Sequence, residues 1–489
     1  MPRPTAKIQP PLAFIPPRFN PWVWRLVQLL LPLRMRYISQ ISEVSVTHGD
    51  RLVDLYRDFQ AEKIRFLMAF RHPSVTDPEC LFRLLSHDVP QAARRGGVSL
   101  TQPVHSHFIY DRGIPLWAGP AVGWLYARLG GIPIKRGKVD TPSLRSIRQH
   151  FAHGRFPMAA APEGATNGHS EIVSPIEPGM AQFGFWCAED LEKAGRTETV
   201  WILPIGLQYQ FVTPPWRALE SLLSELEQAS GIPPHPSLNL HDGVDPTHRQ
   251  QTVLYGRLLR LGEHLLQLME QFYTTFYHQS LTPPAAVADR RPAIAEQRDE
   301  SVDGARVEEL DSLDSNSTLR SRLQALLNTA LSVAEEFFGM TPKGSFTERC
   351  RRIEQAAWDW IYREDLKQTD GMAPVELGLA NRIAEEADLR IWHMRVVETF
   401  VSVTGYYVKE KPTAERFAET LLLVRDVVMR LKGDDPLPQP KLGQRRAHIT
   451  IGEPISISDR LLDYRKNRKG AIAAFTQDLQ TALESMILP

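Results

Sequence analysis

The feature that most constrains the fold of this chain is a set of nearly continuous apolar runs that alternate with segments of helical periodicity. The runs span residues 64–70, 156–161 and 200–207, and their content of large apolar side chains is typical of strands buried on both faces. Apolar residues at helical spacing fill the segments between them. This alternation predicts an α/β fold with a mixed, mostly parallel sheet flanked by helices.

Polar residues follow these strands, at the positions where ligands bind in sheets of this type. His72 comes directly after the first run, and Asp77 stands five residues later, where a helix is predicted to begin. Pro73 stiffens the turn between them. The carboxylate would then accept one imidazole N–H and leave the other ring nitrogen to take a proton from a hydroxyl. The alternative is an ordinary helix N-cap at Asp77 and a surface histidine.

Two further turns carry candidate binding residues. A short strand from residue 132 ends in Lys135 and Arg136, whose charges suit an anion, although an isolated basic pair is more often a solvated turn. Glu163 and Gly164 follow the strand 156–161, and a glycine there lets the backbone approach a ligand closely. Any tight turn would have the same composition.

Several classes of site and partner find little support. Lys and Arg together number 57, as do Asp and Glu, so no global basic field suggests nucleic acid. His105, His107 and Asp111 invite a metal site, but no second carboxylate cluster completes one, and we expect them to be structural or to line a cleft. The three cysteines form no metal-binding or disulfide pattern: Cys80, Cys187 and Cys350. No metal or cofactor is therefore expected.

The segment Trp22–Leu33 is apolar but shorter than the ~20 residues that a membrane span needs. Its tryptophans and arginines suit an interfacial helix that lies on a membrane, and a core helix that packs on the following domain is the alternative. Residues 214–279 have a helical pattern, and residues 281–317 have the composition of a flexible linker. Residues 318–433 predict four amphipathic helices in a bundle. A strand near 447–455 and a helix from 469 to 486 follow.

Taken in order, the blocks at the strand ends resemble those of the glycerolipid acyltransferases, whose best-known member is lysophosphatidate acyltransferase. The matching residues are His72-x4-Asp77, Gly131-x3-Lys135-Arg136, Pro162-Glu163-Gly164 and Leu203-Pro204-Ile205. The late stretch Ile451-Gly452-Glu453-Pro454 also resembles a strand of that family. The third block continues Ala165-Thr166-Asn167, so an arginine usual in the family is missing.

The resemblance implies an acyltransferase-type sheet with a large all-helical insertion before its last strand. The implied domains are an N-terminal arm and membrane-associating helix (1–40), an α/β acyltransferase domain with a helical extension (41–280), a linker (281–317), a helical insertion (318–440) and a terminal strand and helix returning to the sheet (441–489).

The implied activity is transfer of a fatty acyl group from acyl-CoA or acyl carrier protein to a hydroxyl of a glycerol-phosphate lipid, at the cytoplasmic face of a membrane. His72 would be the general base and Asp77 its partner, Arg136 with Lys135 would hold the acceptor phosphate, and Glu163 and Gly164 would shape the acceptor site. Two alternatives remain open: a non-catalytic lipid-binding or scaffold relative, and an acyl-thioester hydrolase.

Overall fold

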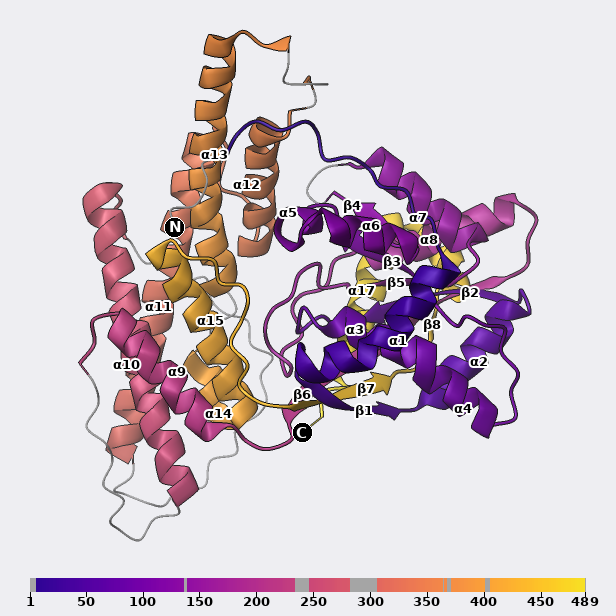
Figure 1. The fold of residues 1–489 in the computed structure, drawn as a ribbon, viewed down its shortest axis with the longest axis horizontal. Coiled ribbons are helices and arrows are strands. Elements are labelled where there is room, and N and C mark those ends of the chain that lie inside the picture. The colour runs from indigo at the N-terminus through magenta and orange to yellow at the C-terminus, as the bar shows by residue number, and fades with distance from the viewer. Residues whose placement is uncertain are drawn as a thin grey trace. The chain divides into compact units, whose positions relative to one another are not determined.

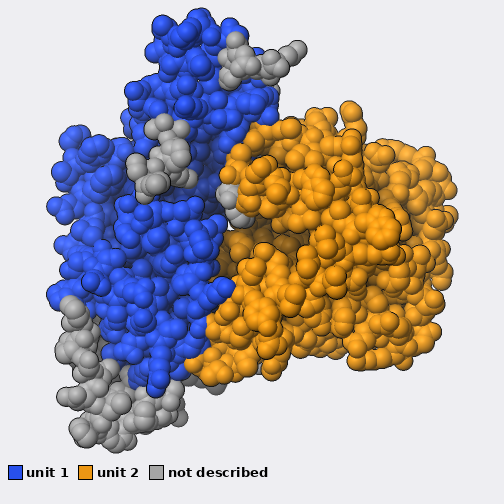
Figure 2. Space-filling view, viewed as in Figure 1, with its two compact units in different colours: residues 1–11, 215–442 blue, residues 12–214, 443–489 orange. Residues whose placement is uncertain are grey.

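The structure, a computed structural model, describes residues 6–135, 139–233, 246–281, 306–363, 365–366, 371–400 and 405–488. The chain divides into two compact units (Figure 2). The α/β unit consists of Leu12–Pro214 and Gly443–Pro489, and the helical unit consists of Met1–Pro11 and Pro215–Leu442. The chain leaves the α/β unit at Pro214, whereas the sequence analysis grouped the helical extension up to residue 280 with that domain.

Within the described residues the α/β unit has one mixed, mostly parallel sheet, as the sequence predicted (Figure 1). The strand order is β1-β7-β6-β2-β5-β3-β4, and β8 pairs with β6. Strands β2, β3, β4, β5 and β6 run parallel to one another, and β7 runs antiparallel to β6. The strands are β1 (Ile41–Thr47), β2 (Ile64–Phe70), β3 (His107–Asp111), β4 (Ile132–Ile134), β5 (Met158–Ala160), β6 (Thr199–Phe211), β7 (Arg445–Ile451) and β8 (Ile455–Ser456).

Helices cover both faces of this sheet. They are α1 (Pro21–Tyr37), α2 (Gly49–Gln60), α3 (Asp77–Arg83), the π-helical turn η1 (Leu84–Asp88), α4 (Val89–Arg95), α5 (Ile114–Ala118), α6 (Pro120–Arg128), α7 (Thr141–His153), α8 (Gly179–Lys193), the 3-10 turn η3 (Ser458–Arg460), α16 (Leu461–Lys466) and α17 (Arg468–Glu484). Alternate residues of the fully buried strand β2 enter different cores. Phe66 and Met68 pack with α1 to α4, whereas Leu67 and Ala69 pack with α7, α8 and α17. Each large side chain so buried contributes roughly 1.5–3 kcal/mol, which fixes the end of β2 firmly in space.

Strand β7 pairs with β6 as in a hairpin, although the two strands are far apart in the sequence. Strand β7 pairs antiparallel with β6, from Ile205 opposite Ile451 to Phe211 opposite Arg445. On its other side β7 pairs with β1, so the strand predicted near 447–455 lies inside the sheet. Its alternating pattern, with Ala447 and Ile449 buried, matches a strand whose two faces meet different surroundings.

The helical unit contains α9 (Trp216–Ala229), α10 (Pro246–Phe276), α11 (Arg306–Phe337), α12 (Phe346–Ile361), α13 (Pro374–Phe400), α14 (Gly405–Glu410) and α15 (Ala414–Lys432). Helices α9 and α10 belong to it because their apolar faces pack against α15 and α11. Where the sequence predicted a linker over 281–317, residues 306–317 instead form the first turns of α11, and residues 282–305 lie outside the described part. Strong helix formers such as Glu and Leu allow those turns without a large apolar face.

Candidate active site

The end of β2 brings an imidazole and a carboxylate together. Arg71 continues the strand, since its N–H donates to the carbonyl of Ile205 on β6 at 2.9 Å. After a turn braced by Pro73, the helix α3 begins at Asp77, whose side chain is fully buried. His72 Nδ1 lies 2.8 Å from Asp77 Oδ2, and the histidine side chain is 22 % exposed. The two residues singled out in the sequence are therefore in direct contact.

Asp77 does not act as a helix N-cap. The cap position of α3 is occupied by Thr76, whose side chain makes no capping bond. The Oδ2 of Asp77 instead accepts from the backbone N–H of Ser74 at 2.9 Å, which ties the turn to the carboxylate. Of the two interpretations that the sequence left open, the geometry matches a carboxylate that orients the imidazole.

The other carboxylate oxygen of Asp77 accepts a hydrogen bond from Tyr209, a residue that was not predicted to belong to the site. Strand β6 runs past the end of β2, and the Tyr209 hydroxyl donates to Asp77 Oδ1 at 2.5 Å. Burial, followed by the nearby charge of Asp77, raises the pKa of Tyr209 well above its ordinary value, so the phenol stays a neutral donor. The sequence held a signal for it: Ile205, Leu207 and Tyr209 alternate along β6 and enter the same core.

The bond to Asp77 also sets which ring nitrogen of His72 is available. With Nδ1–H donated to the carboxylate, Nε2 carries the lone pair, and within the described residues Nε2 makes no hydrogen bond. The ring edge packs on Phe70, with centroids 6.0 Å apart. A partly exposed basic nitrogen on an oriented imidazole is the arrangement that accepts a proton from an incoming hydroxyl.

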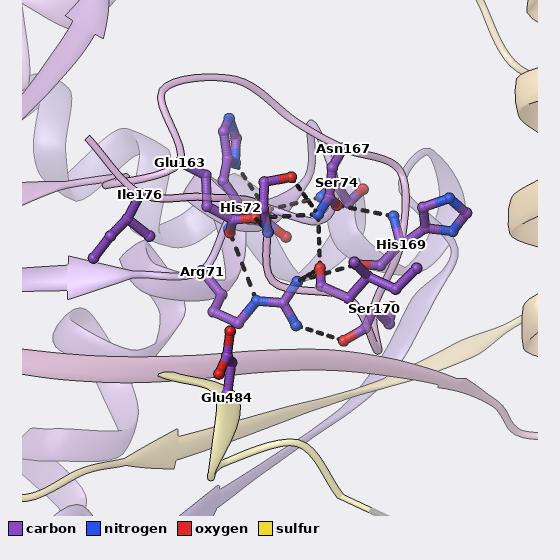
Figure 3. Close-up of polar contacts among 12 residues, drawn as sticks. Arg71, His72, Ser74, Glu163, Asn167, His169, Ser170, Ile176 and Glu484 are labelled. Atoms are coloured by element: carbon purple, nitrogen blue, oxygen red, sulfur yellow. Dashed lines mark hydrogen bonds and ion pairs between the residues drawn. The ribbon is translucent and has the colours of Figure 1, made fainter. Parts of the chain in front are cut away.

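Glu163 lies beside this couple because β5 is the parallel neighbour of β2. Its Oε1 accepts the backbone N–H of His72 at 2.8 Å (Figure 3). Its Oε2 accepts from Asn167 Nδ2 at 3.1 Å and from the N–H of Ser174 at 3.0 Å. Gly164 follows with φ +74°, a conformation that favours glycine. Glu163 is thus a buried brace that joins the His72 turn to the loop after β5.

Arg71 is a second residue that the sequence analysis passed over, and its guanidinium is almost completely buried. Nη1 donates to the carbonyl of Ser170 at 2.6 Å, and Nη2 donates to the carbonyls of His169 at 3.1 Å and Ile172 at 2.5 Å (Figure 3). Its Nε lies 3.6 Å from Glu163 Oε1. A buried guanidinium requires such partners, because an unpaired charge in the interior is costly. Arg71 therefore fastens the loop after β5 to the strand that ends in His72.

Lys135 follows β4, the outermost strand on one side of the sheet, and β4 is parallel to β3, β5 and β2. The carboxyl ends of these parallel strands lie at the same end of the sheet, so Lys135 and His72 both lie at that end. The Lys135 N–H donates to Asp140 Oδ2 at 2.9 Å, and the guanidinium of Arg112 forms an ion pair with the same carboxylate. Arg136 lies outside the described residues.

The histidines near β3 are buried and bonded to backbone carbonyls. His105 Nε2 lies 2.7 Å from the carbonyl of Leu129, and His107 Nδ1 lies 3.0 Å from that of Gly130. Burial lowers the pKa of His105 to about 4 and that of His107 to about 3. In the part of the chain that the structure describes, no group of three or more His, Cys, Asp or Glu side chains is arranged to hold a metal ion.

Comparisons with protein-family models, with curated proteins and with solved structures each find no match for this chain. Among the described helices, none combines the length and the apolar character that crossing a membrane requires.

Proposed function

We propose that the protein is an O-acyltransferase that moves a fatty acyl group from an acyl thioester, acyl-CoA or acyl carrier protein, to a hydroxyl of a glycerol-phosphate lipid such as lysophosphatidate. The observation that best supports the proposal is the 2.8 Å contact between His72 and a buried Asp77 at a strand end. The reaction class is inferred from the order of the four sequence blocks. The His72–Asp77 contact supports it, because an imidazole oriented in this way is able to accept the proton of the acceptor hydroxyl.

In the proposed reaction, His72 Nε2 accepts the proton of the acceptor hydroxyl while the hydroxyl oxygen attacks the thioester carbonyl carbon. The C–S bond then breaks, the new ester C–O bond remains, and the leaving thiolate takes the proton back from the imidazolium. Asp77 keeps the ring oriented and stabilises its charged form. Because the acceptor attacks the thioester directly, no side chain of the protein becomes acylated.

The acceptor phosphate would be held by Lys135, which lies at the same end of the sheet as His72, together with Arg136. Glu163 and Gly164 would shape the acceptor site rather than touch the phosphate, since both Glu163 oxygens accept bonds from the protein.

The first test replaces the proposed base. His72→Ala and Asp77→Asn should each lower kcat for transfer from acyl-CoA to lysophosphatidate by about 10²–10⁴-fold, which is the usual contribution of general-base catalysis. Transfer is measured with labelled acyl-CoA and acyl carrier protein against a panel of glycerolipid acceptors, with products resolved by mass. His87 offers a matched control, because its Nδ1 lies 2.8 Å from Asp88 Oδ1 at an exposed position.

His87→Ala should leave kcat unchanged, and circular dichroism should show all three variants folded. If His72→Ala transfers acyl groups at the rate of the parent protein, the base assignment is wrong. Lipid binding without transfer to any acceptor would favour a scaffold role, and release of free fatty acid in place of transfer would favour a hydrolase.

We further propose that α1 attaches the α/β unit to the cytoplasmic surface of a membrane, where the lipid acceptor would be found. One face of α1 is apolar and exposed at Trp22, Leu26, Leu29 and Leu33, which are spaced by three or four residues. Trp24, Leu31 and Met35 are buried on the opposite side. Exposed Trp and Leu beside arginines are typical of helices that lie in the headgroup region.

Leu29→Glu should reduce binding to vesicles that contain anionic lipid by about tenfold or more, since a charge in the apolar boundary is strongly unfavourable. Flotation of the full-length protein with such vesicles measures the change. Leu462→Glu is the control, because Leu462 on α16 is similarly exposed, 67 % against 73 % for Leu29. Equal loss in both variants, or loss in neither, would contradict the assignment of α1.

A further inference from the structure

Helix α13 of the helical unit is apolar on two opposite faces, and the described residues cover only one of them. Ala380, Ala384 and Ala387 are buried in a small core with residues of α12 and with Ile8. On the other face Val375, Leu379 and Leu389 are 75, 64 and 56 % exposed. Figure 1 shows one end of α13 projecting past α12. An exposed stripe of large aliphatic side chains on a helix marks an interaction surface.

The spacing along this stripe is that of a coiled-coil seam. Positions 375, 379, 382, 386 and 389 are separated alternately by four and three residues, so they occupy a and d positions of a heptad repeat. The apolar members are Val375, Leu379 and Leu389, and the two central members are Arg382 and Glu386. Arg382 is exposed to 74 % and Glu386 to 43 %, each paired only with a neighbour on its own helix in the described contacts.

The two central charges select one orientation of a second copy. In a parallel, in-register pair each Arg382 would face Arg382 and each Glu386 would face Glu386, which is repulsive. In an antiparallel pair centred at the level of residue 384, Arg382 faces Glu386 of the other copy and Leu379 faces Leu389. Two-fold symmetry forms each of these contacts twice. The seam then consists of four successive layers, with aliphatic pairs outside and ion pairs inside.

We propose that α13 pairs with α13 of a second copy of this chain, antiparallel, through the stripe Leu379, Arg382, Ile383, Glu386 and Leu389. The pairing is independent of the acyl-transfer proposal. Its seam covers only about 15 Å of each helix at 1.5 Å per residue, so it is smaller than a standard interface. We therefore expect a dimer that dissociates in the micromolar range.

Sedimentation velocity of the full-length protein over a range of concentrations should show a reversible monomer–dimer equilibrium. Arg382→Glu should weaken dimerisation by about tenfold or more, because it places like charges together at two symmetric positions. Adding Glu386→Arg to that variant should restore dimerisation, because the charges are then merely exchanged. Arg465→Glu is the control, since it reverses an arginine of α16 that, like Arg382, forms an ion pair with a glutamate.

A crosslinking experiment tests the orientation separately. Leu379→Cys protein mixed with Leu389→Cys protein should form an intermolecular disulfide, whereas either variant alone should not, because antiparallel pairing sets residue 379 opposite residue 389. The native cysteines should not form competing intermolecular disulfides, since all three are buried. A monomer at every concentration would overturn the proposal. So would crosslinking of each variant only with itself, or a double charge exchange that fails to restore the dimer.

Discussion

Both oxygens of the Asp77 carboxylate are occupied by the protein, and this limits how strongly it can act on His72. Tyr209 donates to Oδ1, while Ser74 N–H and His72 share Oδ2. A donor on a carboxylate spreads its negative charge and so weakens its support for the imidazolium. If His72 is the base, Tyr209 is a positioning residue that holds the carboxylate in place.

Tyr209→Phe should therefore lower kcat for acyl transfer, because Asp77 Oδ1 loses the hydroxyl donor that holds the carboxylate in place. The loss should be smaller than in His72→Ala, since the imidazole itself remains. Steady-state rates of acyl transfer to lysophosphatidate measure the loss. Tyr110→Phe is the control, since the buried Tyr110 hydroxyl has no hydrogen-bond partner in the described structure. An unchanged kcat in Tyr209→Phe would contradict the positioning role assigned to Tyr209.

The sequence predicted part of this arrangement and missed the rest for a physical reason. His72 and Asp77 are five residues apart, so a short turn is enough to join them. The side-chain hydrogen-bond partners of Arg71 and Tyr209 are 98 or more residues away in the sequence, and only the pairing of β2 with β5 and β6 brings them together. An arginine after an apolar strand looks like a surface residue until its carbonyl partners are known.

At the scale of elements, the apolar periodicity was sufficient for the strands and helices of the α/β unit. The predicted strand 64–70 is β2, and the helix predicted to begin at Asp77 is α3. The pattern could not give the order of strands, since β7 lies between β1 and β6 through contacts that span the whole chain. The apolar pattern also did not predict the boundary between the two units at Pro214. The helices before and after residue 280 have the same kind of amphipathic pattern, so nothing in it separated the first group from the α/β unit.

The segment just before strand β3 has a consequence for acid stability, because burial holds His105 neutral. Its pKa is lowered from 6.5 to about 4, so between these values the unfolded chain takes up a proton that the folded chain does not. The free energy of unfolding therefore falls as pH decreases from about 6.5, with a contribution of about 1.4 kcal/mol per pH unit.

His105→Gln keeps an N–H donor for the carbonyl of Leu129 and cannot titrate. Its free energy of unfolding, measured by urea denaturation between pH 4 and 7, should depend less steeply on pH than that of the parent protein. His48→Asn is the control: His48 is exposed and has φ +58°, which asparagine tolerates. Parallel curves for parent and His105→Gln would show that His105 does not carry this dependence.

At the scale of the whole molecule, the helical unit is inserted within a hairpin of the sheet. Val212 N–H donates to the carbonyl of Gln444 at 2.9 Å, so the chain leaves and re-enters the α/β unit at neighbouring positions. Replacing residues 215–442 by a linker of about five residues, a common hairpin length, and removing residues 1–11 should leave a folded α/β unit.

Circular dichroism and a cooperative thermal transition measure that outcome. A second deletion that extends to residue 451 removes β7 and should not fold, because β1 and β6 both lose the strand that lies between them. An unfolded first deletion would show that the α/β unit depends on the inserted helices. Folding of both deletions would show that β7 is dispensable.

The place of β7 also determines when the sheet is completed during synthesis on the ribosome. Strand β1 pairs with β7, which is about 400 residues further along the chain. Until that strand emerges, β1 and the outer edge of β6 carry unpaired backbone groups, which are able to pair with another nascent chain. The protein therefore has an aggregation-prone interval that lasts for the translation of the whole helical unit, and a chaperone that covers strand edges would act on this chain in that interval.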